Sequence, residues 1–466
     1  MTSPWTMEQA ATIVQGALRG PGGPMPAVFR VDSRLVEKGD AFVALPGTHM
    51  DGHAFVPQAL RQGARMVVVS AKRASSDHPG DSEFPEVSWL VVHDTTEALR
   101  ELASAWAHAV DPSHWIAITG SVGKTTTREA LRSVLQRHLV VHAAEKSFNT
   151  WIGCALTVLG MPESTDTVLL EMGANHPGEI QSLVESYPPT VAVITEVAEA
   201  HLEGFGSLEG VLRAKWEITS SDRLRMLSYN GDNELLCQAV ASSLLPEIYT
   251  VPVGYGVDTA RGVKLQTADV EIRDGRPVLR CRCSVYGRPV ELVSGLFGMH
   301  HAYTMGYVLG VSHFLGVSPD QVAYGLEAMQ APQGRGAVEL LEGGVLVDES
   351  YNANPASVGA ALRNLRALAL SGRRVAVLGG MRELGEMSSQ LHRKILREAS
   401  FLDALIVVGE EWGSCDGDLP AQGRRVPDAA TALEALQILR RPGDHILVKG
   451  SRAYALESVV AGLKKS

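Results

Sequence analysis

The chain has 466 residues, of which 45% are hydrophobic and 20% are charged, and it carries a formal net charge of −10. This composition fits a globular protein of roughly two to four domains, and the negative charge argues against a nucleic-acid binder, which normally has a basic face. The five cysteines lack the paired spacing of a zinc site and favour a reducing compartment. The first residues do not resemble a signal peptide, and no apolar run approaches the ~20 residues needed to span a membrane. We therefore expect a cytoplasmic protein without membrane insertion.

Residues 1–110 are predicted to form a small mixed unit. Residues 41–45 and 66–69 are short apolar runs typical of buried strands, and residues 55–63 between them have the spacing of a helix.

Residues 111–330 predict a second unit, built on a parallel sheet. The apolar runs 116–119, 168–171 and 191–194 are short and alternate with helical patterns, as the strands of a parallel α/β sheet do. Residues 264–293 predict a β-ribbon.

A boundary is expected near residue 331, and residues 331–466 predict a further α/β unit. Its expected strands, separated by helical patterns, are residues 345–347, 375–378, 405–408 and 446–448.

The loop that follows the first strand of the central unit has the residues that grip phosphate. Glycines let backbone N–H groups curl around phosphate oxygens, and the helix N-terminus that follows adds about half a positive charge. Lys124 supplies a full charge, and a hydroxyl at the position of Thr125 can bind Mg²⁺. A glycine turn with an incidental lysine is the alternative, but strand, loop, Gly-Lys-Thr and helix occur here in order. The loop predicts ATP-binding residues Gly120, Ser121, Val122, Gly123, Lys124, Thr125 and Thr126.

Two metal-ligand candidates follow the next strands of this unit. Glu171 and His201 stand where α/β sheets place their ligands, and together with Thr125 they predict a Mg²⁺ site. Taken singly, Glu171 would be a loop cap and His201 a polar loop residue; the phosphate loop beside them favours the metal site. Lys215, by contrast, lies in a predicted helix and is expected from the sequence alone to be solvated.

The phosphate loop is shorter than the common form. Two residues separate Gly120 from Gly123, where the common loop has four. This spacing resembles the Mur ligases and the folylpolyglutamate synthetases. The chain is similar to the Mur ligase family over nearly its whole length, through residues 32–34, 39–45, 51–53, 148–153, 171–179, 200–215, 348–355 and 447–452.

The resemblance implies three α/β domains. Residues 1–110 would be a small mixed UDP-substrate-binding domain, residues 111–330 a central parallel-sheet ATPase domain, and residues 331–466 a Rossmann-like C-terminal domain. The UDP-type first domain argues against a folylpolyglutamate synthetase.

The resemblance also implies an activity. It is strongest to the members that join D-alanyl-D-alanine to UDP-N-acetylmuramoyl-tripeptide through an acyl phosphate, using ATP and Mg²⁺ in peptidoglycan precursor synthesis. The Asp-Asn-Pro-Arg signature of a branch that adds a single amino acid is missing from the sequence. A monomer is expected, and the third residue of the peptide, lysine or diaminopimelate, stays open, as do the residues that recognise the dipeptide.

Individual residues take roles from the same resemblance. Lys124, His201 and Lys215 would be catalytic, with Lys215 carbamylated. Arg335 would bind ATP phosphate, and Asn352 would bind the base and ribose. The implied UDP-substrate-binding residues are Ser33, Arg34 and Asn149.

Four positions depart from the family pattern. His301 and Thr304 replace two asparagines, Gly380 replaces an aspartate, and Glu196 replaces an asparagine. These changes leave open a divergent ligase with another amine acceptor, or a catalytically weak nucleotide-binding paralogue. Because Lys124, the metal candidates and Lys215 are all retained, we expect an active ligase.

Overall fold

The computed structural model describes most of the chain as two compact units. The described residues are 5–47, 50–73, 84–144, 147–243, 247–273, 276–368 and 371–464. The first unit comprises residues 1–115, 140–172 and 185–188, and the second comprises residues 116–139, 173–184 and 189–466.

The first unit contains a five-stranded sheet in the order β1-β5-β4-β3-β2. Strands β2 to β5 are parallel, and β1 runs antiparallel to β5. The predicted strands at 41–45 and 66–69 are confirmed as β3 and β4. The sheet strands are β1 (Ala17–Arg19), β2 (Phe29–Arg30), β3 (Ala41–Val43), β4 (Met66–Ser70) and β5 (Ser88–Val92). The other elements are α1 (Met7–Ile13), α2 (Val56–Arg61), α4 (Thr95–Val110), β7 (Val141–Ala143), α6 (Trp151–Leu159) and β8 (Thr167–Glu171).

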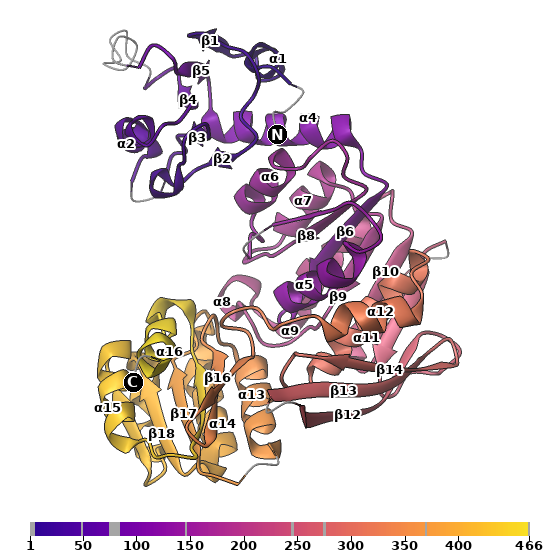
Figure 1. Ribbon diagram of the computed structural model, residues 1–466, viewed down its shortest axis with the longest axis vertical. Coiled ribbons are helices and arrows are strands. Elements are labelled where there is room, and N and C mark those ends of the chain that lie inside the picture. Colours follow the sequence, from indigo (N-terminus) through magenta and orange to yellow (C-terminus); the bar gives the residue numbers. More distant parts are fainter. Residues whose placement is uncertain are drawn as a thin grey trace. The chain divides into compact units, whose positions relative to one another are not determined.

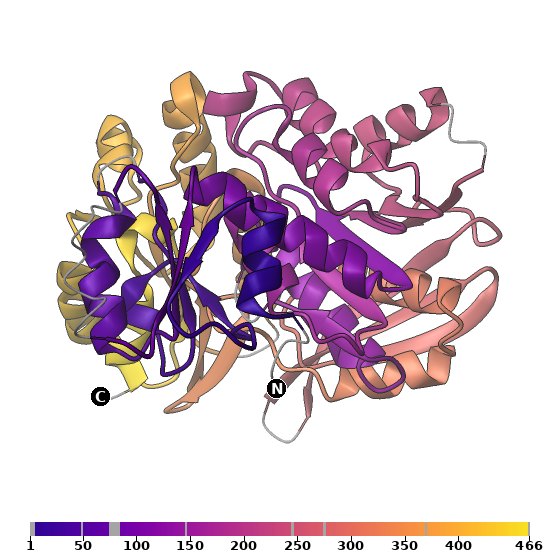
Figure 2. The ribbon, with the colours of Figure 1, turned by 90° about the horizontal axis from the view of Figure 1, so that it is seen from above.

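The second unit contains the phosphate loop on a mostly parallel sheet. Strands β6, β9, β10, β11 and β12 are parallel neighbours, and β12, β13 and β14 form the predicted antiparallel ribbon, seen in Figure 1 and from above in Figure 2. These strands are β6 (His114–Thr119), β9 (Val191–Ile194), β10 (Met226–Asn230), β11 (Tyr249–Gly254), β12 (Val263–Arg273), β13 (Arg276–Val285) and β14 (Arg288–Ser294). Its helices are α5 (Lys124–Leu135), α7 (Glu179–Ser186), α8 (Leu202–Phe205), α9 (Leu208–Trp216), α10 (Glu234–Ser242), α11 (His301–Phe314) and α12 (Pro319–Glu327).

A second sheet of this unit has the order β15-β16-β20-β17-β18-β19. All pairs are parallel except β15 with β16. The four strands predicted beyond residue 331 are confirmed as β16, β17, β18 and β20. The strands are β15 (Ala337–Leu341), β16 (Gly344–Glu349), β17 (Arg374–Gly379), β18 (Ala404–Val408), β19 (Gly423–Val426) and β20 (His445–Lys449). The helices are α13 (Pro355–Ala367), α14 (Ser388–Glu398), α15 (Ala429–Leu439) and α16 (Glu457–Lys464).

Helices cover both faces of this sheet, so its inner strands β16, β17, β18 and β20 are mostly apolar and buried (Figure 1). Alternate residues serve the two faces: Val347 and Leu447 pack with α13 and α14, whereas Leu346 and Ile446 pack with α15 and α16. The architecture is therefore α/β, with parallel sheets that carry polar residues at the carboxyl ends of their strands.

We predict that Leu447→Ala lowers the free energy of unfolding by about 2–5 kcal/mol, because it leaves a cavity in a core that cannot fully collapse. Leu447 is 0% exposed. Ile438→Ala is the control, since Ile438 is 86% exposed and should change the free energy little. Urea unfolding measures both, and equal effects of the two substitutions would contradict the packing described.

Candidate active site

The phosphate loop joins β6 to α5 and has two glycines with positive φ, Gly120 at 140° and Gly123 at 85°. A Cβ on Gly120 would lie 2.1 Å from the Thr195 hydroxyl oxygen, so glycine is required there on steric grounds as well. The Lys124 ammonium donates to the Gly120 carbonyl at 2.5 Å, across the loop. The predicted strand, loop and helix are thus all present, with the N-terminus of α5 at the loop.

The segment that follows β9 holds this loop in shape. The Thr195 hydroxyl donates to the Val122 carbonyl (2.5 Å), the Ser121 N–H donates to the Glu196 carbonyl (2.8 Å), and the Ser121 hydroxyl donates to Ala198 (2.9 Å). A loop held by these side-chain and backbone bonds is preorganised before any phosphate arrives.

Glu196, one of the four departures, turns its carboxylate away into a polar cluster. Its oxygens accept from the side-chain amides of Asn230 (2.7 Å) and Asn233 (2.5 Å). Burial raises the pKa of Glu196, partly offset by these hydrogen bonds. The Ser121 N–H bonds to the backbone carbonyl of Glu196, so this contact with the loop does not depend on the side chain at position 196.

Lys215 is buried, and the expectation of a solvated helix lysine is wrong. It lies near the end of α9 with 1% of its surface exposed, and its ammonium nitrogen is 5.4 Å from the centre of the Phe205 ring. Burial, together with the positive charge of Lys124, lowers the pKa of Lys215 to about 7, although Glu217 and Glu179 oppose the shift. The helix spacing held a signal for this, because Lys215 lies four residues after the buried Val211 on the same face of α9.

His201 lies at the start of α8, where the charges of both Lys124 and Lys215 act on its imidazole. Burial lowers its pKa, Glu383 opposes that shift, and both Lys124 and Lys215 contribute to it. Its ring stands edge-on to Phe205, with the centres 6.4 Å apart. The structure therefore brings together Lys124, His201 and Lys215, the three residues predicted to be catalytic.

Arg335 and Asn352 lie on the two segments that flank β15 and β16. The Arg335 guanidinium stacks 4.1 Å from the Tyr351 ring centre. The backbone carbonyl of Asn352 accepts from the Lys449 ammonium at 3.0 Å, while its side chain accepts from the Ala353 N–H at 2.9 Å. Their predicted nucleotide contacts stay predictions.

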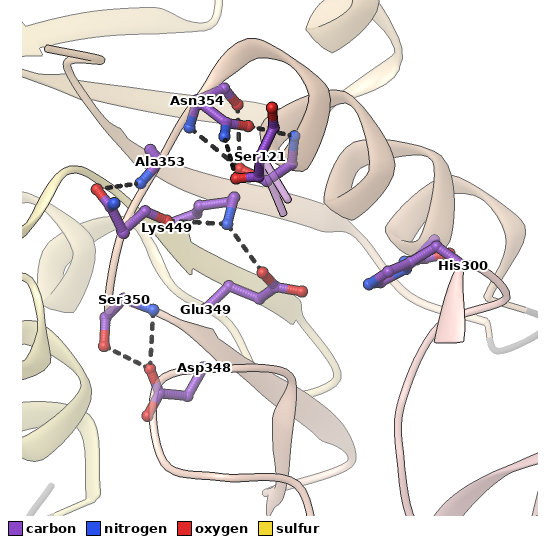
Figure 3. A network of polar contacts seen from close by, with 11 residues as sticks. Ser121, His300, Asp348, Glu349, Ser350, Ala353, Asn354 and Lys449 are labelled. Carbon is purple, nitrogen blue, oxygen red and sulfur yellow. Dashed lines mark hydrogen bonds and ion pairs between the residues drawn. The ribbon is translucent and has the colours of Figure 1, made fainter. Parts of the chain in front are cut away.

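Asn354, which the sequence analysis did not single out, connects this segment to the phosphate loop. Its side-chain amide donates to the Ser121 carbonyl at 3.3 Å, and its oxygen caps α13 by accepting from the Ser357 N–H at 2.9 Å (Figure 3). An asparagine followed by proline is a common start of a helix, but the sequence holds no local signal of its contact with a loop 233 residues away.

A buried ion pair anchors the same segment. The Lys449 ammonium bonds to Glu349 at 2.9 Å, and Asp348 beside it accepts from the Ser350 hydroxyl at 2.6 Å and from the Ser350 N–H at 3.1 Å (Figure 3). Burial alone would raise the pKa of Glu349, but Lys449, with His300 and Arg335 nearby, holds that pKa below its usual value.

The remaining predicted residues lie in the first unit. Ser33 is buried and donates to the Gln58 side chain at 2.9 Å, whereas Arg34 is exposed and pairs with Asp32. Asn149 is half-buried in the loop before α6. Their predicted role toward a UDP-linked substrate stays a prediction.

Glu171 ends β8 and is almost fully buried, with the Cys154 thiol donating to its carbonyl at 3.4 Å. It belongs to the first unit, and its predicted metal partners Thr125 and His201 belong to the second. Within the described ranges, no three His, Cys, Asp or Glu side chains form a metal-binding group. The predicted set contains only two residues of these types, Glu171 and His201, together with the Thr125 hydroxyl. This finding therefore does not test the set, which stays a prediction.

The other three departures are at buried positions. His301 and Thr304 are buried in the first turns of α11, and burial holds the pKa of His301 well below its usual value. A Cβ on Gly380 would lie 2.4 Å from a carboxylate oxygen of Glu411. An acidic group therefore occupies the space beside Gly380, although it comes from another part of the chain.

Three domain models of one family match the chain. They are the Mur ligase catalytic domain at residues 28–107, the Mur ligase middle domain at 118–311 and the glutamate ligase domain at 335–452. The chain is 31% identical to UDP-N-acetylmuramoyl-tripeptide–D-alanyl-D-alanine ligase of Escherichia coli and 30% identical to that of Bacillus subtilis, each over 99% of this chain and 98% of the relative. The chain belongs to the Mur ligase family.

Solved structures agree with this membership. MurF of Acinetobacter baumannii superposes with a TM-score of 0.85 at 27% identity, covering 100% of both chains. MurF of Thermotoga maritima in complex with ADP superposes with a TM-score of 0.79 at 27% identity, covering 94% of this chain and 97% of that one. This Mur ligase is accordingly an ATP-dependent enzyme with the three Mur domains. No helix in the part of it that the structure describes is long and apolar enough to cross a membrane.

We predict that Glu349→Gln destabilises this Mur ligase at neutral pH and that the difference from wild type narrows in acid. The folded-state pKa of Glu349 is depressed below the ordinary glutamate value of 4.5. Its stabilising contribution is therefore present above that value and is lost as pH falls through the folded pKa. Urea unfolding at pH 7 and at lower pH measures the difference.

The exposed Glu434 supplies the control, Glu434→Gln, which should match wild type at both pH values. A Glu349→Gln deficit that stays constant between neutral and acidic pH would contradict the ion pair.

Proposed function

We propose that this Mur ligase joins D-alanyl-D-alanine to UDP-N-acetylmuramoyl-tripeptide and converts ATP to ADP and phosphate. The full-length identity to the ligases of that name carries the proposal. The grouping of Lys124, His201 and Lys215 beside an intact phosphate loop supports catalysis rather than mere nucleotide binding. Cytoplasmic location, a monomeric state and domain limits at 110/111 and 330/331 belong to the same proposal.

The reaction proceeds in two steps. A carboxylate oxygen of the tripeptide attacks the γ-phosphorus of ATP, the bond to the bridging oxygen breaks, and ADP leaves an acyl phosphate. The amine of D-alanyl-D-alanine then attacks the acyl carbon, the C–O bond to phosphate breaks, and the amine gives up a proton as the amide forms. The first step joins two anions, so it requires charge neutralisation and alignment more than covalent catalysis.

This chain's own residues meet that requirement at the phosphate loop. Lys124 lies across the loop, where its charge would stabilise the transferring phosphoryl group. Arg335 brings a second permanent cation, and Asn354 fixes the loop backbone through Ser121. Loop residues 120–126, Arg335 and Asn352 are the proposed ATP-binding set, and Ser33, Arg34 and Asn149 the proposed UDP-substrate set.

A Mg²⁺ ion fits the donor groups available. Thr125 offers a hydroxyl, Glu171 a carboxylate, and His201 an imidazole whose lowered pKa keeps it neutral and able to donate an electron pair. When bound, the metal would neutralise phosphate charge. These three residues are the proposed metal ligands.

The buried amine of Lys215 fits carbamylation. An amine whose pKa is about 7 is about half unprotonated at pH 7, and the free electron pair of the neutral form can attack CO₂. The new N–C bond gives a carbamate with release of one proton. The change replaces a cation beside Lys124 by an anion, which removes the repulsion between the two side chains.

The function is tested with a panel of acceptors. In the presence of ATP and UDP-linked tripeptide, ending in lysine or diaminopimelate, we expect ADP and phosphate release with D-alanyl-D-alanine and little with single L-amino acids.

Lys124→Ala should abolish turnover because it removes a preorganised charge.

The opposite acceptor preference would refute the dipeptide assignment and favour a divergent ligase. A wild-type enzyme that binds nucleotide but turns over none of the acceptors would identify a catalytically weak paralogue.

We expect turnover to depend on dissolved CO₂ through Lys215. In CO₂-depleted buffer at pH 7 the rate should fall, and bicarbonate should restore it, since the neutral amine re-forms the carbamate. Lys215→Met should be inactive and unresponsive to bicarbonate, and Lys464→Met, at an exposed C-terminal lysine, is the control. A rate that is the same with and without CO₂ would contradict the carbamate.

A further inference from the structure

Two loops that are far apart in the sequence meet at His201. The His201 ring nitrogen Nδ1 is hydrogen-bonded to the Glu383 carboxylate, and the Glu203 N–H donates to the Glu383 carbonyl at 3.3 Å. Glu383 follows β17 in the C-terminal sheet, 182 residues from His201. One residue thus contacts the histidine loop through both its side chain and its backbone.

The backbone shows that this contact is built into the fold. His201 has a φ of 53° and Glu383 a φ of 64°, the left-handed region that residues with a Cβ seldom adopt. Such conformations persist only where the surroundings enforce them, and they cluster at functional sites. Leu202, next to His201, packs against the apolar core of the C-terminal sheet, which holds the two loops together.

The hydrogen bond to Glu383 determines which nitrogen of the imidazole carries the hydrogen. An ionised carboxylate accepts hydrogen bonds but donates none, so the hydrogen in this contact must lie on Nδ1. In a neutral imidazole that leaves Nε2 as the nitrogen with the free electron pair. A carboxylate on the second nitrogen is how proteins orient histidines that act through the first.

We propose that Glu383 is a positioning residue for ligation: it holds the His201 ring and its Nδ1–H tautomer, so that Nε2 is the electron-pair donor. The proposal rests on the proposed function, in which His201 acts at the phosphoryl-transfer site. Glu383 acts there only through His201. Because it follows β17, it also connects the C-terminal sheet to the residues around the phosphate loop.

An ion pair of this exposure would contribute little stability by itself. The side chain of Glu383 is 53% exposed and that of His201 is 29% exposed, and exposed pairs contribute little. Glu383→Ala should therefore leave the unfolding midpoint nearly unchanged, and any loss of rate would not be due to unfolding.

The test compares three full-length variants: Glu383→Ala, Glu383→Gln and the control Glu386→Ala, which removes an exposed acid three residues further along the same loop. For Glu383→Ala we expect kcat to fall about 10- to 100-fold with KM for ATP little changed. Glu383→Gln should recover most of the rate, because its amide oxygen still accepts from Nδ1–H. Glu386→Ala should match wild type.

The second readout needs neither substrate nor metal. ¹⁵N NMR of the imidazoles in the ligand-free protein, with His201 assigned by comparison with His201→Gln, should show Nδ1–H in wild type and in Glu383→Gln. Glu383→Ala should show Nε2–H or a mixture. Unchanged kcat in Glu383→Ala, or a lower kcat with the tautomer retained, would overturn the proposal.

The two proposals fail in different ways. A wild-type enzyme inactive with D-alanyl-D-alanine would defeat the proposed function, whereas an active wild type whose Glu383→Ala variant keeps rate and tautomer would defeat only the role of Glu383.

Discussion

The burial of the Lys215 amine beside Lys124 is the constraint on which the site depends. A charged amine is costly to bury, and a second cation nearby increases that cost, so the pKa of Lys215 falls to about 7. The phosphate loop therefore carries a permanent cation, Lys124, and the amine of Lys215 nearby is poised between neutral and charged. An amine in that state can become an anion by taking up CO₂, which would convert a repulsive pair into an attractive one.

Segments remote in sequence maintain this arrangement. The backbone after β9 ties down the phosphate loop through Ser121 and Thr195, and Asn354 reaches the same loop from the start of α13. Glu383 reaches His201 from the end of β17. The contacts of Asn354 and Glu383 each join a residue near the carboxyl end of a strand of the C-terminal sheet to a loop of the other sheet. The phosphate loop and the C-terminal sheet are thus joined by direct hydrogen bonds.

Much of the fold and part of the site could be predicted from the sequence. Short apolar runs located the strands because both faces of a parallel sheet are buried, and the phosphate loop was recognisable because glycine positions and Lys124 are local features. Lys215 was expected to be solvated because of its charge, although it lies four residues after the buried Val211 on the same face of its helix. The carboxylate of Glu411 beside Gly380 and that of Glu383 at His201 also escaped, because tertiary contacts alone bring them there.

The most direct test of this account is the pKa of Lys215 itself. NMR of the protein labelled with ¹³C-lysine, in CO₂-free buffer and compared with Lys215→Met to assign the signal, follows the titration of this one amine. We expect a midpoint of about 7. A midpoint near 10.5, the ordinary value for lysine, would show that the amine is solvated and charged and would contradict the constraint on which the site depends.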